Sequence, residues 1–176
     1  MDVLVVCLGN ICRSPMAAAF LAARLEELGV DAHVHSAGLL SSGRRVPEHG
    51  VAVMAARGFD TSAHRSRRLS AELVDPADLI VAMARDQVDE IAVAHPEARA
   101  RAFTLKELVR TGERLGARRP GESMSGYVAQ LHTGTSAGDD DIDDPIGGPR
   151  SVYEATAAEV EDLTARLARL LAGAGG

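Results

Sequence analysis

Several reactive side chains lie close together near the start of the 176-residue chain, in "CLGNICRS" at residues 7–14. This stretch holds both cysteines of the sequence, Cys7 and Cys12, followed directly by Arg13 and Ser14. A cysteine thiolate is a nucleophile, and the planar guanidinium of an arginine can hold two oxygens of a phosphoryl group. A serine hydroxyl can donate a hydrogen bond to the sulfur. The combination indicates phosphoryl transfer through a cysteinyl-phosphate.

The elements predicted on either side of this loop are those that an anion-binding site needs. Residues 2–6, "DVLVV", form an apolar run that predicts a buried parallel strand. Ser14 is a candidate N-cap, and Pro15 suits the first position of a helix that ends near Gly29. In a strand–loop–helix unit the loop amides and the positive end of the helix converge on one point. A cysteine at that point, such as Cys7, is favoured as the thiolate.

The loop sequence also has a less specific interpretation. Gly9 and Asn10 tolerate the backbone angles that an anion cradle requires. However, cysteines at strand ends are often simply buried hydrophobic residues, and Cys-x5-Arg-Ser arises by chance in roughly a few per cent of chains. The position between a strand and a capped helix makes such a coincidence much rarer. The absence of Gly-Lys-Ser/Thr excludes a nucleotide-binding loop of the Walker type.

The rest of the chain predicts strands that alternate with helices. Strands are predicted at 30–38, 77–83 and 100–105, and helices at 47–58, 85–95 and 149–171. This order is typical of an α/β fold, and we predict a four-stranded parallel sheet flanked by helices in a single three-layer domain over residues 1–176. Within it, residues 108–141 are predicted to be an atypical long loop or insert with a short helix at 123–131. Residues 172–176 are predicted to fray.

Composition narrows the possible environment and partners. The net charge of −6 argues against a general nucleic-acid binder. No apolar run approaches the length of a membrane span, and the apolar stretch near the N-terminus lacks the features of a signal peptide. Two cysteines do not make a disulfide framework, so we predict a cytoplasmic protein without membrane or nucleic-acid partners.

The stretch "VCLGNICRSPMAAAF" resembles the active-site loop of the bacterial-type low-molecular-weight protein tyrosine phosphatases, and "CLGNICRSP" is a near-verbatim match. The resemblance covers about residues 2–107 and 142–171 and leaves 108–141 unexplained. It implies a four-stranded parallel sheet and a metal-independent phosphatase without cofactor, which hydrolyses phosphotyrosine in proteins or small aryl phosphates. Cys7 would be the nucleophile and Arg13 the phosphate clamp. The phosphate-binding and supporting residues of the loop would be Leu8, Gly9, Asn10, Ile11, Cys12 and Ser14.

The same resemblance implies a general acid in "DDPIGGP". Asp144, followed by Pro145, would protonate the leaving atom and then deprotonate the water that hydrolyses the cysteinyl-phosphate. The neighbouring Asp143 is a weaker candidate. An acidic run such as "DDDIDDP" is otherwise usually a solvated loop.

Two residues outside the loop match the family's supporting positions. Ser36 in "HSAG" and His64 in "AHRSR" would form hydrogen bonds with Asn10 and hold the loop in shape. The alternative is that His64 is an ordinary structural histidine within an exposed basic patch. The other histidines show no metal-like pairing with cysteine or carboxylate, so no metal site is predicted; they are His33, His35, His49, His95 and His132.

The sequence departs from the tyrosine phosphatases in ways that bear on the substrate. Ile146 and Gly147 stand where those enzymes carry tyrosines, and "DPIGG" is more similar to the protein-arginine phosphatase branch. Ile11 instead favours a tyrosine phosphatase, because the tyrosine phosphatases carry isoleucine at this position and the arginine-phosphatase branch carries threonine. We give Ile11 more weight, since it would lie beside the nucleophile, and predict phosphotyrosine as substrate with phosphoarginine as the alternative. Tyr127 is a candidate replacement for the missing aromatic wall.

Two other functional classes are alternatives to a phosphatase. Arsenate reductases share this fold and loop, but they need further cysteines for a disulfide relay, and none follows Cys12. A phosphoprotein-binding module without turnover would not require Cys7, Arg13 and Asp144 together. Cys12 is either a packing residue of the loop or, as the family resemblance favours, the partner of Cys7 in a reversible disulfide that protects the nucleophile from over-oxidation.

Overall fold

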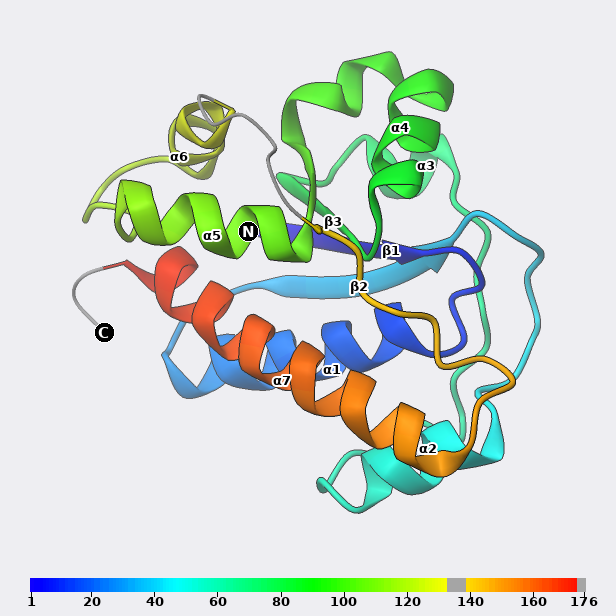
Figure 1. Cartoon of the computed structure of the whole chain (residues 1–176). Coiled ribbons are helices and arrows are strands. Elements are labelled where there is room, and N and C mark those ends of the chain that lie inside the picture. Colours follow the sequence, from blue (N-terminus) through cyan, green and yellow to red (C-terminus); the bar gives the residue numbers. More distant parts are fainter. Residues whose placement is uncertain (133–138, 174–176) are drawn as a thin grey trace.

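A computed structural model describes residues 1–132 and 139–173 of the chain, which form three layers around a parallel sheet (Figure 1). The sheet has the strand order β2-β1-β3-β4. Its strands are β1 (Asp2–Cys7), β2 (His33–Gly38), β3 (Leu79–Ala82) and β4 (Ala102–Thr104). All neighbouring pairs are parallel, which confirms the predicted fold class of an α/β protein with a four-stranded parallel sheet flanked by helices.

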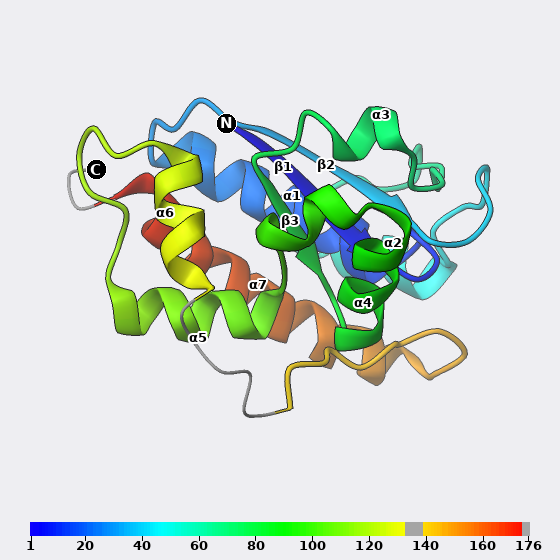
Figure 2. The same ribbon diagram turned by 90° about the horizontal axis from the view of Figure 1, so that it is seen from above.

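Helices cover both faces of this sheet (Figures 1 and 2). They are α1 (Arg13–Glu27), α2 (Glu48–Ala55), α3 (Ala71–Val74), α4 (Arg85–Ala94), the 3₁₀ helix η1 (Pro96–Arg101), α5 (Leu105–Leu115), α6 (Met124–Leu131) and α7 (Arg150–Ala172). Helices α3 and α4 lie on one side, and α1, α2 and α7 lie on the other (Figure 1). Among the described residues, no helix combines the length and apolar character needed to cross a bilayer.

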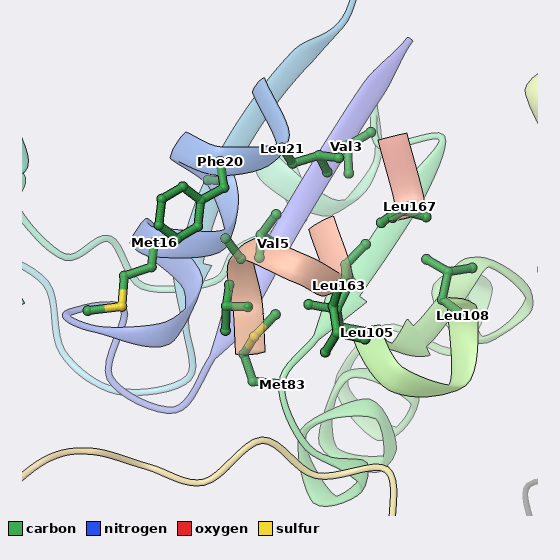
Figure 3. Packing of buried hydrophobic residues seen from close by; sticks show 14 of the residues in the cluster. Val3, Val5, Met16, Phe20, Leu21, Met83, Leu105, Leu108, Leu163 and Leu167 are labelled. Atoms are coloured by element: carbon green, nitrogen blue, oxygen red, sulfur yellow. The ribbon is translucent and has the colours of Figure 1, made fainter. Parts of the chain in front are cut away.

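Alternation along β1 separates the buried side chains into two cores. Val3 and Val5 point toward α1 and α7, whereas Leu4 and Val6 point toward α3 and α4. The larger core is shown in Figure 3, where aliphatic and sulfur-containing side chains of the strands, α1, α5 and α7 interdigitate. Full burial of each Leu, Met or Phe stabilises the fold by about 1.5–3 kcal/mol. This packing fixes α1, whose first turn carries Arg13, against β1, which ends at Cys7.

Several predicted element boundaries are wrong in detail. The helix predicted at 47–58 ends at Ala55, and the strand predicted at 77–83 spans Leu79–Ala82. Helix α1 begins at Arg13, so Ser14 lies inside its first turn and is not the N-cap. Cys12 occupies the cap position, and its side chain forms no capping hydrogen bond. The Ser14 hydroxyl does not cap the helix either, because it contacts the Cys7 sulfur in the loop. The strand predicted at 30–38 begins at His33, and η1 replaces the first residues of the strand predicted at 100–105.

The largest difference concerns residues 108–115, which were predicted as part of a long loop but belong to α5. Thr104 caps this helix, and its side chain accepts a hydrogen bond from the backbone N–H of Glu107. The pattern Thr-x-x-Glu is the signature of a capping box and could have located the helix start. The helix predicted at 123–131 is confirmed as α6. Parts of the predicted loop and of the predicted tail, residues 133–138 and 174–176, lie outside the described residues.

Candidate active site

Cys7 is the last residue of β1, at the carboxyl edge of the sheet. Its sulfur accepts a hydrogen bond of 3.2 Å from the backbone N–H of Asn10 and lies 3.0 Å from the Ser14 hydroxyl. Both contacts are buried. Donors that point at a sulfur stabilise it as a thiolate, which suits it to act both as a nucleophile and as a leaving group.

Asn10 holds the loop together by hydrogen bonds in several directions. Its Nδ2 donates to Ser14 Oγ at 2.9 Å and to Ser36 Oγ at 2.8 Å. Its Oδ1 accepts from the backbone N–H of Arg67 at 2.8 Å, and His64 Nε2 donates to its carbonyl oxygen at 2.8 Å. The φ angle of Asn10 is +48°, a left-handed conformation that costs energy for a residue with a side chain. These bonds stabilise that conformation, and the contacts predicted for Ser36 and His64 are both present.

Gly38 allows the end of β2 to approach this loop closely. It is the register partner of Cys7 in the sheet. A Cβ atom at Gly38 would lie 2.8 Å from both the backbone nitrogen and the Cβ of Asn10, so a larger residue would displace the loop. Gly38 was not predicted as a site residue, although a glycine that ends the "HSAG" strand is a signal of close backbone approach.

Arg13 joins the loop to the segment that carries the predicted acid. Its side chain is buried, and Nη1 donates to the carbonyl oxygen of Ile142 at 2.9 Å. Its Nη2 forms a short ion pair with the carboxylate of Asp144. Ile142 is itself buried and donates its backbone N–H to the Met83 carbonyl at 2.8 Å. The structure therefore brings Cys7, Arg13 and Asp144 together, although Asp144 is distant in the sequence.

The acidic run before Asp144 is fixed to α4 and α5. Its alternative interpretation as a solvated loop is wrong for Asp140, which is buried, whereas Asp141 is exposed and is held by hydrogen bonds. The Asp140 carboxylate is buried and pairs with Arg85, at 3.2 Å, and with Arg110. The carboxylate of Asp141 accepts from the backbone N–H of Arg85 at 2.7 Å, and its carbonyl accepts from Lys106 Nζ at 2.5 Å. No role was predicted from the sequence for Arg85, Lys106 or Arg110.

A cavity of about 110 Å³ opens above the Cys7 sulfur. Its lining consists of Cys7, Leu8, Gly9, Ile11, Cys12, Arg13, Leu40, Arg44, Asp144 and Ile146. Leu8, Leu40 and Ile146 are exposed and give the cavity an apolar rim. Leu40 and Arg44 were missed because they follow β2 in a segment without a recognisable motif.

Two of the weaker candidates lie elsewhere. Tyr127 is buried in α6, where its hydroxyl donates to the Gly116 carbonyl at 3.0 Å. Helix α6 packs beside α5, at the end of the molecule away from α2 (Figures 1 and 2). The hypothesis that Tyr127 supplies an aromatic wall is therefore wrong. Asp143 is exposed and is not among the described residues that line the cavity.

Cys12 is a free, buried thiol in the wall of the cavity. Burial raises its pKa to about 12, and the nearby charges of Asp144 and Cys7 act in the same direction. Tyr153 of α7 forms a hydrogen bond with the Cys12 side chain that opposes this rise. The Cys12 thiol is therefore protonated at neutral pH.

The prediction that the histidines outside the loop show no metal-like pairing with a carboxylate is wrong for His33 and His35, which both contact Asp2. His33 Nδ1 lies 2.7 Å from Asp2 Oδ2, and His35 Nε2 lies 2.9 Å from Asp2 Oδ1. His95 Nδ1 lies 3.7 Å from a carboxylate oxygen of Glu97. The parallel register pairs Asp2 with His33, and this neighbourhood cannot be read from sequence spacing.

A parallel α/β sheet with a cysteine, an arginine and a carboxylate around one anion-binding loop defines a cysteine-dependent phosphatase. The family model described as low molecular weight phosphotyrosine protein phosphatase matches residues 2–123, and the chain belongs to this family.

Relatives in this family carry two kinds of name. The chain is 37% identical to a protein-arginine-phosphatase of Geobacillus stearothermophilus, covering 96% of this chain and 95% of that protein. It is 44% identical over 107 residues to EpsP of Ralstonia solanacearum, a probable low molecular weight protein-tyrosine-phosphatase, covering 60% of this chain and 71% of that one. Among solved structures, a mutant of YwlE from Bacillus subtilis superposes with a TM-score of 0.77, 32% identity and 96% coverage of both chains.

Proposed function

We propose that this chain hydrolyses phosphotyrosine in proteins, and small aryl phosphates, through a cysteinyl-phosphate on Cys7. The observation that carries the proposal is the convergence of Cys7, Arg13 and Asp144 on one small cavity. The donors around the sulfur, Asn10 N–H and Ser14 Oγ, suit a thiolate that must attack and later leave.

In the first step, the Cys7 thiolate attacks phosphorus and the bond from phosphorus to the leaving oxygen breaks. Asp144, in its protonated form, gives its proton to that oxygen. Arg13 exchanges its contact with Asp144 for the phosphoryl oxygens, and so stabilises the charge that they carry in the transition state. The products of this step are the free phenol and the cysteinyl-phosphate.

In the second step, water attacks phosphorus and the sulfur–phosphorus bond breaks. The Asp144 carboxylate accepts the proton of the attacking water and is restored to its acid form. Ser14 and the Asn10 amide stabilise the departing Cys7 thiolate, and inorganic phosphate leaves. Each step of this cycle uses only side chains and amides of the loop together with Asp144.

The preference for phosphotyrosine rests on the apolar character of the cavity. Ile11 lines it beside the nucleophile, and the rim is formed by Leu8, Leu40 and Ile146. An aryl ring gains free energy by contact with such side chains, and a hydrogen-bonding guanidinium group gains less.

Phosphoarginine is the second candidate substrate. The relatives that match nearly the whole chain include two named protein-arginine-phosphatases, and "DPIGG" lacks the tyrosines of the tyrosine phosphatases. In that reaction the bond from phosphorus to the guanidinium nitrogen breaks, and Asp144 protonates the nitrogen. The catalytic residues are the same, so only the contacts of the leaving group separate the two candidates.

The experiment that separates them compares peptides carrying phosphotyrosine, phosphoarginine or phosphoserine, in a chelator-containing buffer. We expect kcat/KM for phosphotyrosine to exceed that for phosphoarginine by about 10–200-fold, the range that one apolar contact provides. Ile11→Thr should narrow this ratio. A phosphoarginine preference in the parent protein would contradict the first assignment and support the second.

The catalytic assignments are tested separately on a generic aryl phosphate. Cys7→Ser should lower kcat by about 10⁴-fold or more, and Asp144→Asn by about 10²–10⁴-fold with phosphate binding retained. Asp143→Asn is the matched control in the same acidic run and should behave like the parent. Unchanged turnover in Cys7→Ser would contradict the mechanism.

The setting of the enzyme is part of the same proposal. We propose a cytoplasmic phosphatase that acts on phosphorylated proteins and whose residues 1–176 form a single phosphatase domain.

A further inference from the structure

The Asp2, His33 and His35 side chains meet at the amino ends of β1 and β2. His33 and His35 alternate along β2 and so point to the same face of the sheet, and Asp2 is the register partner of His33. This is the face covered by α3 and α4, but β2 is the edge strand and these helices leave its amino end partly open. The side chain of His33 is 71% exposed, that of Asp2 21% and that of His35 9%.

The geometry of these three residues is that of a chelating group. One oxygen of Asp2 lies 2.7 Å from His33 Nδ1, and the other lies 2.9 Å from His35 Nε2. The two imidazoles stack with their centroids 4.6 Å apart and an interplanar angle of 15°. One ligand atom from each residue fits within a span of 4.8 Å. Ligands of tetrahedral zinc lie about 2.0–2.2 Å from the ion and so about 3.4 Å from one another, which small side-chain rotations would achieve here.

A second carboxylate lies beside this group. That of Asp78 accepts the backbone N–H of Asp2 at 2.8 Å, so two acidic side chains lie at the amino end of β1. Their negative charge favours a cation there.

Arg67 is the cation that opposes metal binding. Its Nη2 donates to His35 Nδ1 at 3.4 Å, which places the ring proton on Nε2, facing Asp2. An ion bound at Nε2 requires that proton to move to Nδ1, so Arg67 must release the ring. It has two other hydrogen bonds, from Nε and Nη2 to the carbonyl of Ser36 at 3.3 and 3.1 Å, and these hold the guanidinium beside β2 when the longer contact breaks.

We propose that Asp2, His33 and His35 form a binding site for a late first-row divalent metal ion such as Zn²⁺. Two imidazoles and a carboxylate are the ligands that such ions prefer, and water completes the coordination at the exposed side of His33. The bound ion cross-links the edge strand β2 to β1 and therefore stabilises the fold by mass action.

This site is distinct from the catalytic cavity. Asp2 lies five positions before Cys7 on β1, a distance of roughly 17 Å at about 3.3 Å per residue. The catalytic residues lie at the carboxyl ends of the same strands, and the ion takes no part in the proposed hydrolysis.

The test is calorimetric titration of Zn²⁺ into the tag-free full-length chain carrying Cys7→Ser, so that the catalytic thiolate does not bind the ion. We expect one Zn²⁺ per chain and a Tm that rises with Zn²⁺ concentration. Adding His33→Ala should weaken binding at least tenfold and abolish the rise in Tm. Because His33 is largely exposed, this variant should keep its fold, which circular dichroism would verify.

The matched control is His95→Ala, which removes an imidazole that pairs with a single carboxylate, Glu97. It should leave Zn²⁺ affinity unchanged, whereas Arg67→Ala should tighten binding several-fold. Binding that is absent from the parent, or that is unchanged by His33→Ala or lost equally in His95→Ala, would overturn the proposal. Unchanged affinity in Arg67→Ala would overturn the assignment of His35 as a ligand.

Discussion

The loop at residues 7–14 and the segment at 139–145 face the same cavity but are held in place differently. The loop is fixed by short, uncharged hydrogen bonds centred on Asn10, nearly all of them buried or close to the adjoining strand ends. The acid-bearing segment is fixed mainly by ion pairs and hydrogen bonds with basic side chains of α1, α4 and α5. The nucleophile Cys7 is therefore held rigidly by hydrogen bonds within and next to its own loop. The acid Asp144 is positioned by ion pairs with residues that are distant in the sequence.

The largest effect is expected from breaking the loop at Asn10. Asn10→Ala removes three side-chain hydrogen bonds and the residue type that tolerates a φ angle of +48°. We expect a loss of about 3 kcal/mol in the free energy of unfolding and a fall in kcat of about 100-fold. Gln130→Ala is the control, because this amide lies on α6 away from the cavity, and it should leave kcat unchanged. Parent-like turnover in Asn10→Ala would contradict the role of the loop.

A smaller effect is expected from breaking the acid-bearing segment at Asp140. Asp140→Ala leaves Arg85 and Arg110 without the carboxylate that they share. Because both arginine side chains are about one-third exposed, we expect the free energy of unfolding to fall by about 2 kcal/mol. With phenyl phosphate, a poor leaving group that depends on protonation, kcat should fall about tenfold. With p-nitrophenyl phosphate it should change by less than about threefold.

The control for this comparison is Asp143→Ala, an exposed carboxylate of the same run. It should leave both substrates unaffected. An equal loss with the two substrates in Asp140→Ala would show that the ion pairs support the fold alone and do not position Asp144.

The cap of α5 should have a weaker influence on the same segment. Thr104→Ala removes the side-chain oxygen that accepts the Glu107 N–H, and a lost N-cap costs about 1 kcal/mol. Lys106 and Arg110 remain on a helix that frays at its start, so kcat should fall by less than about threefold. Thr104→Ser keeps the acceptor and should restore stability in chemical denaturation. A loss of stability equal in both variants would indicate that the methyl group, not the cap, is responsible.

The smallest effect is expected at the buried thiol beside both segments. Because the pKa of Cys12 is about 12, about one thiol in ten thousand is ionised at pH 8. In Cys7→Ser, where Cys12 is the remaining cysteine, iodoacetamide should label the native protein negligibly and the unfolded protein fully, as mass spectrometry would show. Labelling of the native protein at the unfolded rate would contradict this. The Cys7–Cys12 disulfide predicted from the family resemblance requires Cys12 to lose its proton, so it should form slowly at neutral pH.

The contrast between the two regions also explains how much could be predicted from the sequence. Cys7, Asn10, Arg13 and Ser14 lie within eight residues, so their spacing predicted a strand, a loop and a helix start as well as the chemistry. Residues that are distant in the sequence but support the site were predicted where a family motif marked them, as for Ser36 and His64. They were missed where none did, as for Asp140, because charge pairing between distant elements leaves no periodic signal.

Helix α5 was missed for a related reason. Leu105, Leu108 and Val109 do recur at helical spacing, but Gly112 suggested a loop. The glycine is explained only by packing, since a Cβ there would lie 2.7 Å from Leu170 of α7. The boundary error at Ser14 has the same origin. A hydroxyl that looked like a helix cap is used by the loop instead, because it lies 3.0 Å from the nucleophile sulfur.

The pairing of Arg13 with Asp144 has a consequence for selectivity. Both terminal nitrogens of the guanidinium are engaged within the protein, one by the Ile142 carbonyl and one by a carboxylate. Asp144 is thus a tethered anion with a high effective concentration at Arg13, and any free anion must displace it. A phosphoryl dianion brings more charge to that exchange than a singly charged anion does, and it can contact Arg13 and the loop amides together. The ion pair is therefore expected to favour dianions before any contact with the leaving group is made.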